Sequence, residues 1–458
     1  MALLPPAVAE RLAPLGSWLD RDRPAGAAVL GWRCFQLGVF VLPASALLAA
    51  VLLFVALVQG TRGRGGWRAW WADPANRVLA LLGVLMLLGA VLVQGFEGYS
   101  RGLAWAGLFN WLPFFWGFWG FQPYLASPAA RRRVGLWLVA ATVPVLVTGL
   151  GQLFLGWSGP WQILGGLVIW HLKQGGRPEG RLSGLFDYAN ITAAWLSLSW
   201  PLLLAALLSC GRRWRSALRG TDPQGGSAVR RGGVLVVVLA LAAAQVAALY
   251  LTDSRNAWGA LLLAVPIVGG PASWLWLLPL LLLALLPVLL ASLPGVPALL
   301  QDPARHLVPQ SIWGRLNDLN HHGERKLASL RLSQWTVAAS LVAERPWLGW
   351  GAAAFSVIYP LRTGTWHGHP HNIAVDLAVS HGLPAAVLLV GFVLGLLIRA
   401  VRRGMAAGPV AERAWWAAAL VLVVLHATDI PMYDSRINIA GWILLAGLRC
   451  RTGELKAH

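Results

Sequence analysis

Four histidines are concentrated in one short segment, residues 366–382, which reads WHGHPHNIAVDLAVSHG. Three of them, His367, His369 and His371, alternate, so in an extended chain their side chains would share one face. Imidazole is a common metal ligand, but a zinc site needs three or four ligands with supporting hydrogen bonds. Pro370 interrupts the alternating run, and no carboxylate or cysteine accompanies it in the sequence. We therefore predict no metal ion and no other cofactor.

His371 differs from the other histidines of this segment because Asn372 follows it and an apolar helix is expected to begin next. A neutral imidazole in such a place can take a proton from a hydroxyl group, which makes His371 a candidate general base. A helix cap or a surface histidine is the alternative. His381 falls inside the expected helix, where we interpret it as a packing or polar-lining residue.

Two arginines have positions that suit the binding of an anion. Arg255 ends the short segment Thr252-Asp-Ser-Arg between two apolar runs, so it is expected at the membrane surface. There its guanidinium would either bind a phosphate or simply extend to the interface. Arg331 would lie in the first turn of a helix over residues 331–344, where a cation opposes the helix dipole. An anion facing Arg331 and a solvated charge are equal alternatives.

The other candidate residues are either polar side chains or glycines, whose backbone can adopt conformations that other residues seldom adopt. Ser254 precedes Arg255 at the membrane surface. Gly349 and Gly351 permit a tight backbone turn beside a ligand. Asn190 enters an apolar segment, and we interpret it as a helix cap, with a residue facing a polar cavity as the alternative.

These residues belong to a chain of 458 residues that is 57% hydrophobic and only 12% charged. Apolar runs long enough to cross a bilayer recur along it, which predicts an all-α, polytopic integral membrane helix bundle. The net charge of +19 would suggest nucleic acid only on a basic face of a soluble domain. Here the arginines lie in short loops between apolar runs, so we predict no nucleic-acid partner.

About twelve transmembrane helices are predicted. The block 34–59 is interrupted at Leu42-Pro43 and has arginines on both sides, so we interpret it as two short helices. The other ten spans are single apolar runs, at about 78–95, 103–125, 134–155, 189–209, 233–251, 256–270, 272–293, 378–400, 414–428 and 437–448.

The positive-inside rule then orients the chain, because this arrangement places most lysines and arginines in cytoplasmic loops. Both termini are expected in the cytoplasm, and the histidine segment faces the other side. The expected regions are a cytoplasmic segment 1–33, helices 1–9 in 34–295, an extracytoplasmic loop 296–377 with a surface helix, helices 10–12 in 378–448, and a cytoplasmic tail 449–458.

The combined pattern resembles the O-antigen ligase and O-antigen polymerase superfamily of bacterial polytopic membrane glycosyltransferases. The resemblance rests on the spans, a short outer Ser-Arg element, and a late outer loop with Arg331-x-x-x-Trp335 and a Pro-x-x-Gly-x-Gly turn. It also rests on a His-Asn pair followed, after nine residues, by Gly382. The sequence departs from the pattern after Gly382, which a second glycine usually follows, and at Tyr188-Ala-Asn190, where relatives often have Asn-Pro-Asn. One ligase-related domain is expected within about 180–400.

The resemblance implies transfer of a glycan from undecaprenyl pyrophosphate to an acceptor hydroxyl at the outer face of the bacterial plasma membrane. It implies no metal and no nucleotide sugar. The expected partners are membrane lipid, the lipid-linked glycan donor and a glycolipid or other hydroxyl acceptor. The implied catalytic residues are His371 as base and Arg255 and Arg331 on the pyrophosphate. The implied substrate-binding residues are Asn372, Ser254, Asn190, Gly349 and Gly351.

A second branch of the same superfamily, linked to inorganic-carbon uptake in cyanobacteria, provides the alternative function. Glu344-Arg-Pro-Trp-Leu-Gly and Val357-Ile-Tyr-Pro-Leu are similar to that branch. A bicarbonate transporter or accessory protein would be expected to carry charged residues deep within its spans. Most charges here lie at span ends or in loops, and the His-Asn pair favours an enzyme.

Overall fold

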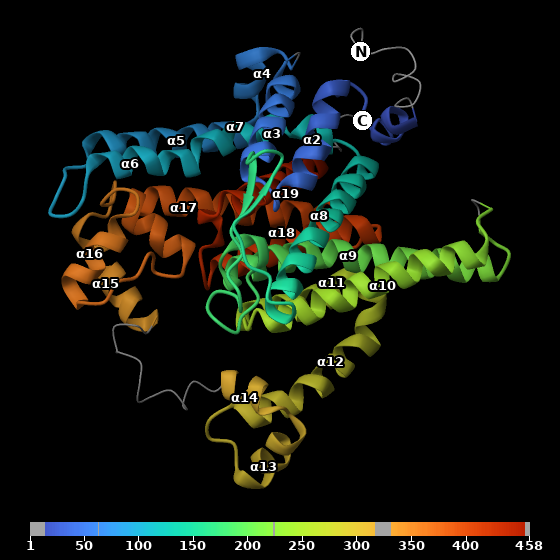
Figure 1. Cartoon of the computed structure of the whole chain (residues 1–458). Helices are drawn as coiled ribbons and strands as arrows, with labels where there is room; N and C mark the ends of the chain where they lie inside the picture. Colours follow the sequence, from blue (N-terminus) through green and yellow to red (C-terminus); the bar gives the residue numbers. More distant parts are fainter. Residues whose placement is uncertain (1–13, 63, 223–224, 317–330, 454–458) are drawn as a thin grey trace.

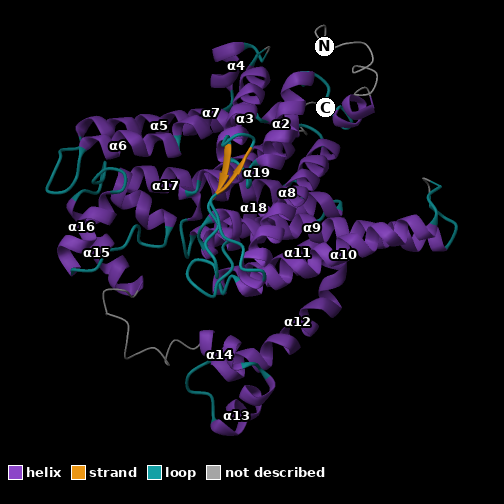
Figure 2. Cartoon of the chain, viewed as in Figure 1, coloured by secondary structure: helices purple, strands orange, loops and turns teal. Residues whose placement is uncertain are grey.

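The computed structural model describes residues 14–62, 64–222, 225–316 and 331–453. Parts of the predicted N-terminal segment, outer loop and C-terminal tail, at 1–13, 317–330 and 454–458, lie outside the described residues. Within the described residues the fold is a helix bundle with one small two-stranded sheet (Figures 1 and 2). The predicted all-α class is therefore confirmed.

Six of the described helices are long and apolar enough to cross a membrane. They are α5 (Pro74–Leu92), α8 (Pro128–Phe154), α9 (Ala189–Leu218), α10 (Ala228–Leu251), α12 (Pro271–Ser292) and α17 (Ile373–Arg402). The bent pair α3 (Ala46–Thr61) and α4 (Gly66–Ala72) passes the same test together. The count of twelve stays a prediction, because α2 (Val29–Val41), α11 (Arg255–Gly269) and α18 (Val410–His426) are shorter than the ~20 residues that a bilayer requires.

Two of the proline-containing apolar segments, 34–59 and 103–125, compare differently with their predictions. The predicted break in 34–59 is confirmed, since α2 ends at Val41 and Ser45 caps α3 by accepting a hydrogen bond from the Leu48 amide. The predicted continuous span 103–125 is wrong, because Pro113 and Pro123 each begin a new helix where their missing amide hydrogen is tolerated. The pieces are α6 (Arg101–Gly107), η1 (Leu108–Asn110), α7 (Leu112–Gly120) and η2 (Gln122–Leu125).

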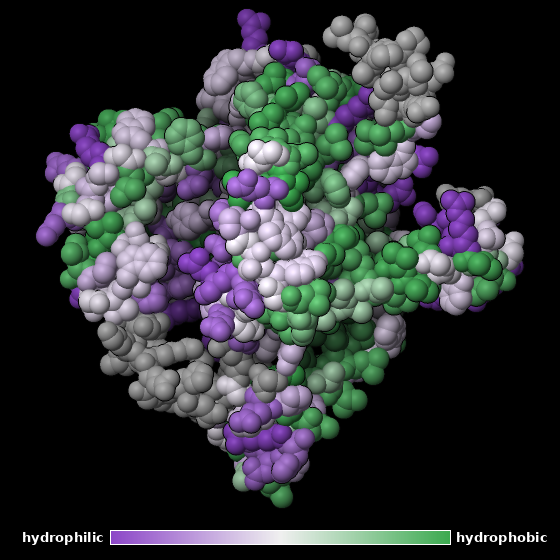
Figure 3. All heavy atoms as spheres, viewed as in Figure 1, coloured by the Kyte–Doolittle hydropathy of each residue, from purple (hydrophilic) through white to green (hydrophobic). Residues whose placement is uncertain are grey.

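Several spans expose their apolar side chains instead of burying them. On α12, Leu275 is 90% exposed, and Leu282 and Leu283 are exposed as well. On α10, Val236 and Val237 are also exposed. Figure 3 shows hydrophobic side chains over much of one face of the bundle, interrupted by hydrophilic patches. Extensive apolar surface of this kind suits lipid chains, so the protein is a membrane protein.

The helix α9 forms the centre of the bundle and packs against α8, α10, α11 and α18. A buried ion pair joins two of these neighbours. Arg131 of α8 donates to both carboxylate oxygens of Glu412 of α18, at 2.9 and 2.8 Å, and both side chains are almost fully buried. Such two-pronged geometry compensates the loss of water around the two charges and fixes the relative position of the helices.

The remaining elements lie around this bundle. They are β1 (Trp161–Ile163) and β2 (Val168–Trp170), which pair antiparallel, η3 (Gly184–Phe186), α13 (Ala298–Leu307), α14 (Gln310–Leu316), α15 (Arg331–Glu344), α16 (Ala354–Thr363), η6 (Pro431–Tyr433) and α19 (Ser435–Gly453). The helix predicted over 331–344 is confirmed as α15. In Figure 1, α15 and α16 lie at the left end of the molecule, and the end of α9 and the start of α10 lie at the right end.

Candidate active site

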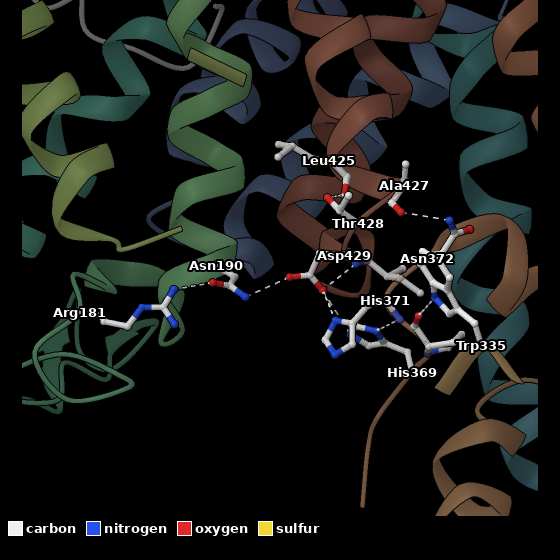
Figure 4. A network of polar contacts seen from close by, with 12 residues as sticks. Arg181, Asn190, Trp335, His369, His371, Asn372, Leu425, Ala427, Thr428 and Asp429 are labelled. Atoms are coloured by element: carbon white, nitrogen blue, oxygen red, sulfur yellow. Dashed lines mark hydrogen bonds and ion pairs between the residues drawn. The ribbon is translucent and has the colours of Figure 1, made fainter. Parts of the chain in front are cut away.

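His371 and Asp429 meet between the start of α17 and the end of α18 (Figure 4). The Nδ1 atom of His371 lies 3.0 Å from Oδ1 of Asp429, although the two residues are 58 positions apart in the sequence. Burial raises the pKa of Asp429, but the hydrogen bond and the charges of the nearby histidines lower it to about 2. An ionised carboxylate at Nδ1 favours the tautomer whose proton is on Nδ1, which leaves Nε2 to accept a proton.

The backbone around His371 has an uncommon conformation. Its φ is +53°, in the left-handed region that residues other than glycine seldom adopt. Its amide donates to Nδ1 of His369 at 3.2 Å, and the indole of Trp335 donates to the carbonyl of Pro370 at 2.8 Å. Such conformations persist where the surroundings impose them, and they concentrate at functional sites.

Asn372 links this turn to both helices. Its side-chain oxygen accepts from the amides of Ala374 and Val375, at 3.0 and 3.1 Å, and so caps α17. Its side-chain nitrogen donates to the carbonyl of Ala427 at 3.0 Å. Asn372 therefore fixes the position of His371, whether or not Asn372 also binds a substrate.

The other two alternating histidines gather around His371. The ring of His369 lies 4.5 Å from that of His371 between centroids, and the ring of His367 lies 6.3 Å away. Burial, followed by the charge of His371, lowers the pKa of His369 to about 4, and the same causes lower the pKa of His367. His369 is therefore neutral at pH 7. His381 is buried inside α17, as predicted.

A carboxylate does accompany the histidines in space, contrary to what the sequence alone indicates. His369, His371 and Asp429 each place one ligand atom within 4.8 Å of the others, an arrangement that could hold a metal ion. The sequence does not reveal this because Asp429 comes from the loop after α18. His367 is not part of the group. The absence of a required metal stays a prediction.

The structure brings Arg331 to the histidines. Arg331 begins α15, and Trp335, one turn later on the same face, contacts the histidine segment. The positive charge of Arg331 is one of the causes that lower the pKa of His369, so the two side chains are close enough to interact. Arg331 is the first described residue of α15, and its predicted place in the first turn of this helix stays a prediction because the residues before it lie outside the described ones.

The second predicted arginine, Arg255, begins α11 directly after the turn from α10. Ser254 is 8% exposed and occupies the N-cap position without a capping side-chain bond. The turn is held by Arg181, whose Nε donates to the carbonyl of Thr252 at 2.7 Å. No local sequence pattern marks Arg181 as a site residue, because it is one arginine in a long polar loop.

The interpretation of Asn190 as a helix cap is wrong. The N-cap of α9 is Tyr188, and no side chain caps this helix. Asn190 instead accepts a hydrogen bond from Arg181 at 2.6 Å and donates one to Asp429 at 3.1 Å. The alternative interpretation, a residue that faces a polar cavity, stays a prediction, because the structure shows polar partners for Asn190 but no cavity beside it among the described residues. Two partners distant in sequence determine the orientation of this amide.

Gly349 and Gly351 lie against α17, roughly two turns beyond Asn372, and not beside His371. A Cβ on Gly349 would lie 2.5 Å from the carbonyl oxygen of Val379, and one on Gly351 would lie 2.2 Å from the hydroxyl of Tyr99. Both glycines have positive φ. The predicted tight turn is confirmed, and in the structure it serves close packing against α17.

An apolar cavity of about 240 Å³ begins beside the His-Asn pair. Asn372 and Ala427 line it next to the hydrogen bond that joins them. The rest of its wall is almost entirely hydrophobic and comes mainly from α17, α18 and α19. The residues of this wall include Leu377, Leu389, Val393, Leu422, Met432, Trp442 and Leu445.

Residues 235–390 match the family model for O-antigen ligase. This segment is an O-antigen ligase domain of the O-antigen ligase superfamily. The matched segment contains Arg255, Arg331, His371 and Asn372, whereas Asp429 lies outside it. No curated protein matches the chain. The family match supports a role of the membrane-glycosyltransferase type.

Proposed function

We propose that this protein transfers a glycan from undecaprenyl pyrophosphate to an acceptor hydroxyl at the outer face of the bacterial plasma membrane. The observation that carries the proposal is the His371–Asp429 pair, 3.0 Å apart and close to Arg331, in a chain whose residues 235–390 match the O-antigen ligase family model. A base that a carboxylate orients, next to fixed positive charge, suits transfer of a sugar from a phosphate leaving group to an alcohol.

In the proposed reaction, Nε2 of His371 accepts the proton of the acceptor hydroxyl. The acceptor oxygen bonds to the anomeric carbon of the first sugar, and the bond from that carbon to the phosphate oxygen breaks. Undecaprenyl pyrophosphate leaves with the bonding electron pair. Asp429 holds the Nδ1 proton and stabilises the imidazolium that forms, since it is ionised at neutral pH.

Arg255 and Arg331 would neutralise the pyrophosphate as its charge increases. Guanidinium groups remain protonated throughout and form paired hydrogen bonds to phosphate oxygens, so they suit this role. Arg331 begins α15 beside the histidines, and Arg255 begins α11 after the turn that Arg181 holds. The proposal assigns both guanidinium groups to the pyrophosphate of the donor.

The cavity beside Asn372 supports a lipid substrate. Its wall is apolar, and it begins one residue from the proposed base. An isoprenyl or acyl chain that occupied it would gain from the burial of each CH₂ group while its headgroup remained at His371. Neither a soluble sugar nor bicarbonate requires such a cavity.

The decisive experiment compares the wild-type protein with His371→Ala in proteoliposomes that contain an undecaprenyl-pyrophosphate-linked glycan and a glycolipid acceptor. We expect glycan transfer by the wild type, without added metal or nucleotide sugar, and its loss in the variant. Transfer at equal rates by both proteins would refute the assignment of His371. Bicarbonate uptake by the wild type without any transfer would instead establish the transport function of the second branch.

A further inference from the structure

We propose that Arg181 and Asn190 are positioning residues that orient Asp429 for His371 and join the base to the turn that carries Arg255. The inference rests on the proposed function and adds to it a second group of residues, from the loop before α9 and the start of α9. Figure 4 shows the series of contacts from Arg181 through Asn190 and Asp429 to His371.

The two oxygens of Asp429 have separate partners. Oδ1 lies 3.0 Å from Nδ1 of His371 and accepts from the amide of Ile430 at 2.9 Å. Oδ2 accepts from Nδ2 of Asn190 at 3.1 Å. The carboxylate is therefore held at both ends, and its Oδ1 is directed at the imidazole.

The chemistry of the neighbours determines which way the Asn190 amide faces. A guanidinium can only donate hydrogen bonds, and an ionised carboxylate can only accept them. The Asn190 oxygen must therefore face Arg181, at 2.6 Å, and its nitrogen must face Asp429. An unsupported asparagine could turn over and present its oxygen to Asp429, where the two acceptors would repel each other.

The neutral amide also keeps the charge of Arg181 away from Asp429. A direct arginine–aspartate pair would give the carboxylate a strong competing partner in place of His371. With Asn190 between them, Arg181 orients the carboxylate through one hydrogen bond, and Asp429 remains the counter-charge of the imidazole. This arrangement explains why an asparagine, and not a second acid, occupies position 190.

Arg181 has a second connection that extends the effect to the anion site. While Nη2 donates to Asn190, Nε donates to the carbonyl of Thr252, at 2.7 Å, three residues before Arg255. One planar guanidinium thus sets the position of the base relative to the Thr252–Arg255 turn. Because catalysis is sensitive to displacements of about 1 Å, this spacing affects turnover.

The most informative variant is Asn190→Asp. The aspartate side chain has the same shape as asparagine and retains an acceptor for Arg181, but it loses the hydrogen-bond donor to Asp429. We expect it, together with Arg181→Met, to lower kcat for glycan transfer roughly 10–100-fold with little change in KM for the donor. Arg181→Lys, which can make one of the two contacts, should recover part of the rate. Arg177→Met is the matched control, because Arg177 lies in the same loop, is exposed and pairs with Asp187.

A double-mutant cycle separates positioning from a general effect on the fold. If Asn190 acts through Asp429, then Asn190→Asp should cause little further loss in an Asp429→Ala background, whereas Arg181→Met should keep the part of its effect that passes through Thr252. Wild-type kcat in both Asn190→Asp and Arg181→Met, or full additivity of Asn190→Asp with Asp429→Ala, would overturn the inference while leaving the proposed function intact. Absence of transfer by the wild type would refute the proposed function, and the inference with it.

Discussion

The side-chain nitrogen of Asn372 donates to the carbonyl of Ala427 at 3.0 Å, and both residues line the apolar cavity next to the His371–Asp429 pair. The polar site and the apolar cavity therefore adjoin at Asn372. We expect a lipid substrate to place its headgroup at the polar site and part of its chain in the cavity.

Filling the cavity should therefore weaken the use of a long-chain donor. We expect Val393→Trp, which projects a large side chain from α17 into the cavity, to lower kcat/KM for an undecaprenyl donor roughly tenfold or more, because each CH₂ displaced from an apolar site costs about 0.8 kcal/mol. Ile398→Trp is the control, since Ile398 also lies on α17 but is 50% exposed and does not line the cavity. An equal loss with a donor of only two or three isoprene units would argue against the cavity as a chain site.

Loss of the base and loss of an arginine should have different kinetic signatures. His371→Ala should reduce turnover by ~10²–10⁴-fold while donor binding stays near normal. Arg255→Ala and Arg331→Ala should weaken donor binding as well, because they would remove charge that contacts the pyrophosphate before and during its departure. Binding of a labelled donor to the purified variants, measured beside transfer rates, distinguishes the two patterns. Normal donor binding in both arginine variants would contradict the proposed anion site.

Metal removal should leave transfer unchanged. His369, His371 and Asp429 have ligand atoms within 4.8 Å of one another, so they are the residues that would bind a metal ion if one were required. We expect EDTA to have no effect and His367→Ala and His369→Ala each to retain most of the activity. Activity that EDTA abolishes and zinc restores would show that the group is a metal site and that His371 is a ligand instead of a base.

Stability should fall as the pH decreases from about 6.5 towards 4. The pKa of His369 is lowered from 6.5 to about 4, so in this window the unfolded chain binds a proton that the folded protein does not. The stability contribution is therefore present above pH 6.5 and lost as the pH falls to 4. Asp429, with a pKa near 2, acts in the same direction but below this window.

Thermal unfolding in detergent between pH 7.5 and 4.5 measures this effect. His369→Gln should lose less stability over the range than the wild type, whereas His171→Gln, at an exposed position, should behave like the wild type. Identical pH profiles for all three proteins would show that His369 does not remain neutral in the folded state.

The orientation in the membrane can be tested with two similarly exposed leucines. Leu361 of α16 is 59% exposed and Leu218 at the end of α9 is 58% exposed. In a background whose three native cysteines are replaced by serine, an impermeant thiol reagent applied to intact cells should label Leu361→Cys and spare Leu218→Cys. The reverse pattern would place His371 in the cytoplasm and remove the proposed donor.

Local sequence signals predicted the local features of the fold well. The helix over 331–344 and the break near Leu42-Pro43 were readable because periodicity, proline and flanking charge act over a few residues. The continuous span at 103–125 failed for the same kind of reason, since its two prolines were outweighed by its overall hydrophobicity. Apolar composition identifies membrane helices but is a poor guide to where they break.

The candidate site was predicted only in part because half of it depends on distant partners. His371, Asn372 and Arg331 belong to recognisable local patterns. Asp429 and Arg181 do not, and each reaches the site only because α9, α17 and α18 begin or end at the same level of the bundle. The interpretation of Asn190 as a cap failed for this reason: its two hydrogen-bond partners come from positions that no local pattern connects.

Gly382 determines how many residues can separate it from the His-Asn pair. It has a φ of +85° at a kink in α17, and a Cβ there would lie 2.1 Å from the carbonyl oxygen of Trp347. One extra residue between Asn372 and Gly382 would rotate the glycine by about 100° around the helix axis and drive a side chain against that carbonyl. The nine-residue interval can therefore accept substitutions but not insertions or deletions. In an alignment, a homologue that keeps this interval would keep the geometry of the site, and one with a different interval would have lost it.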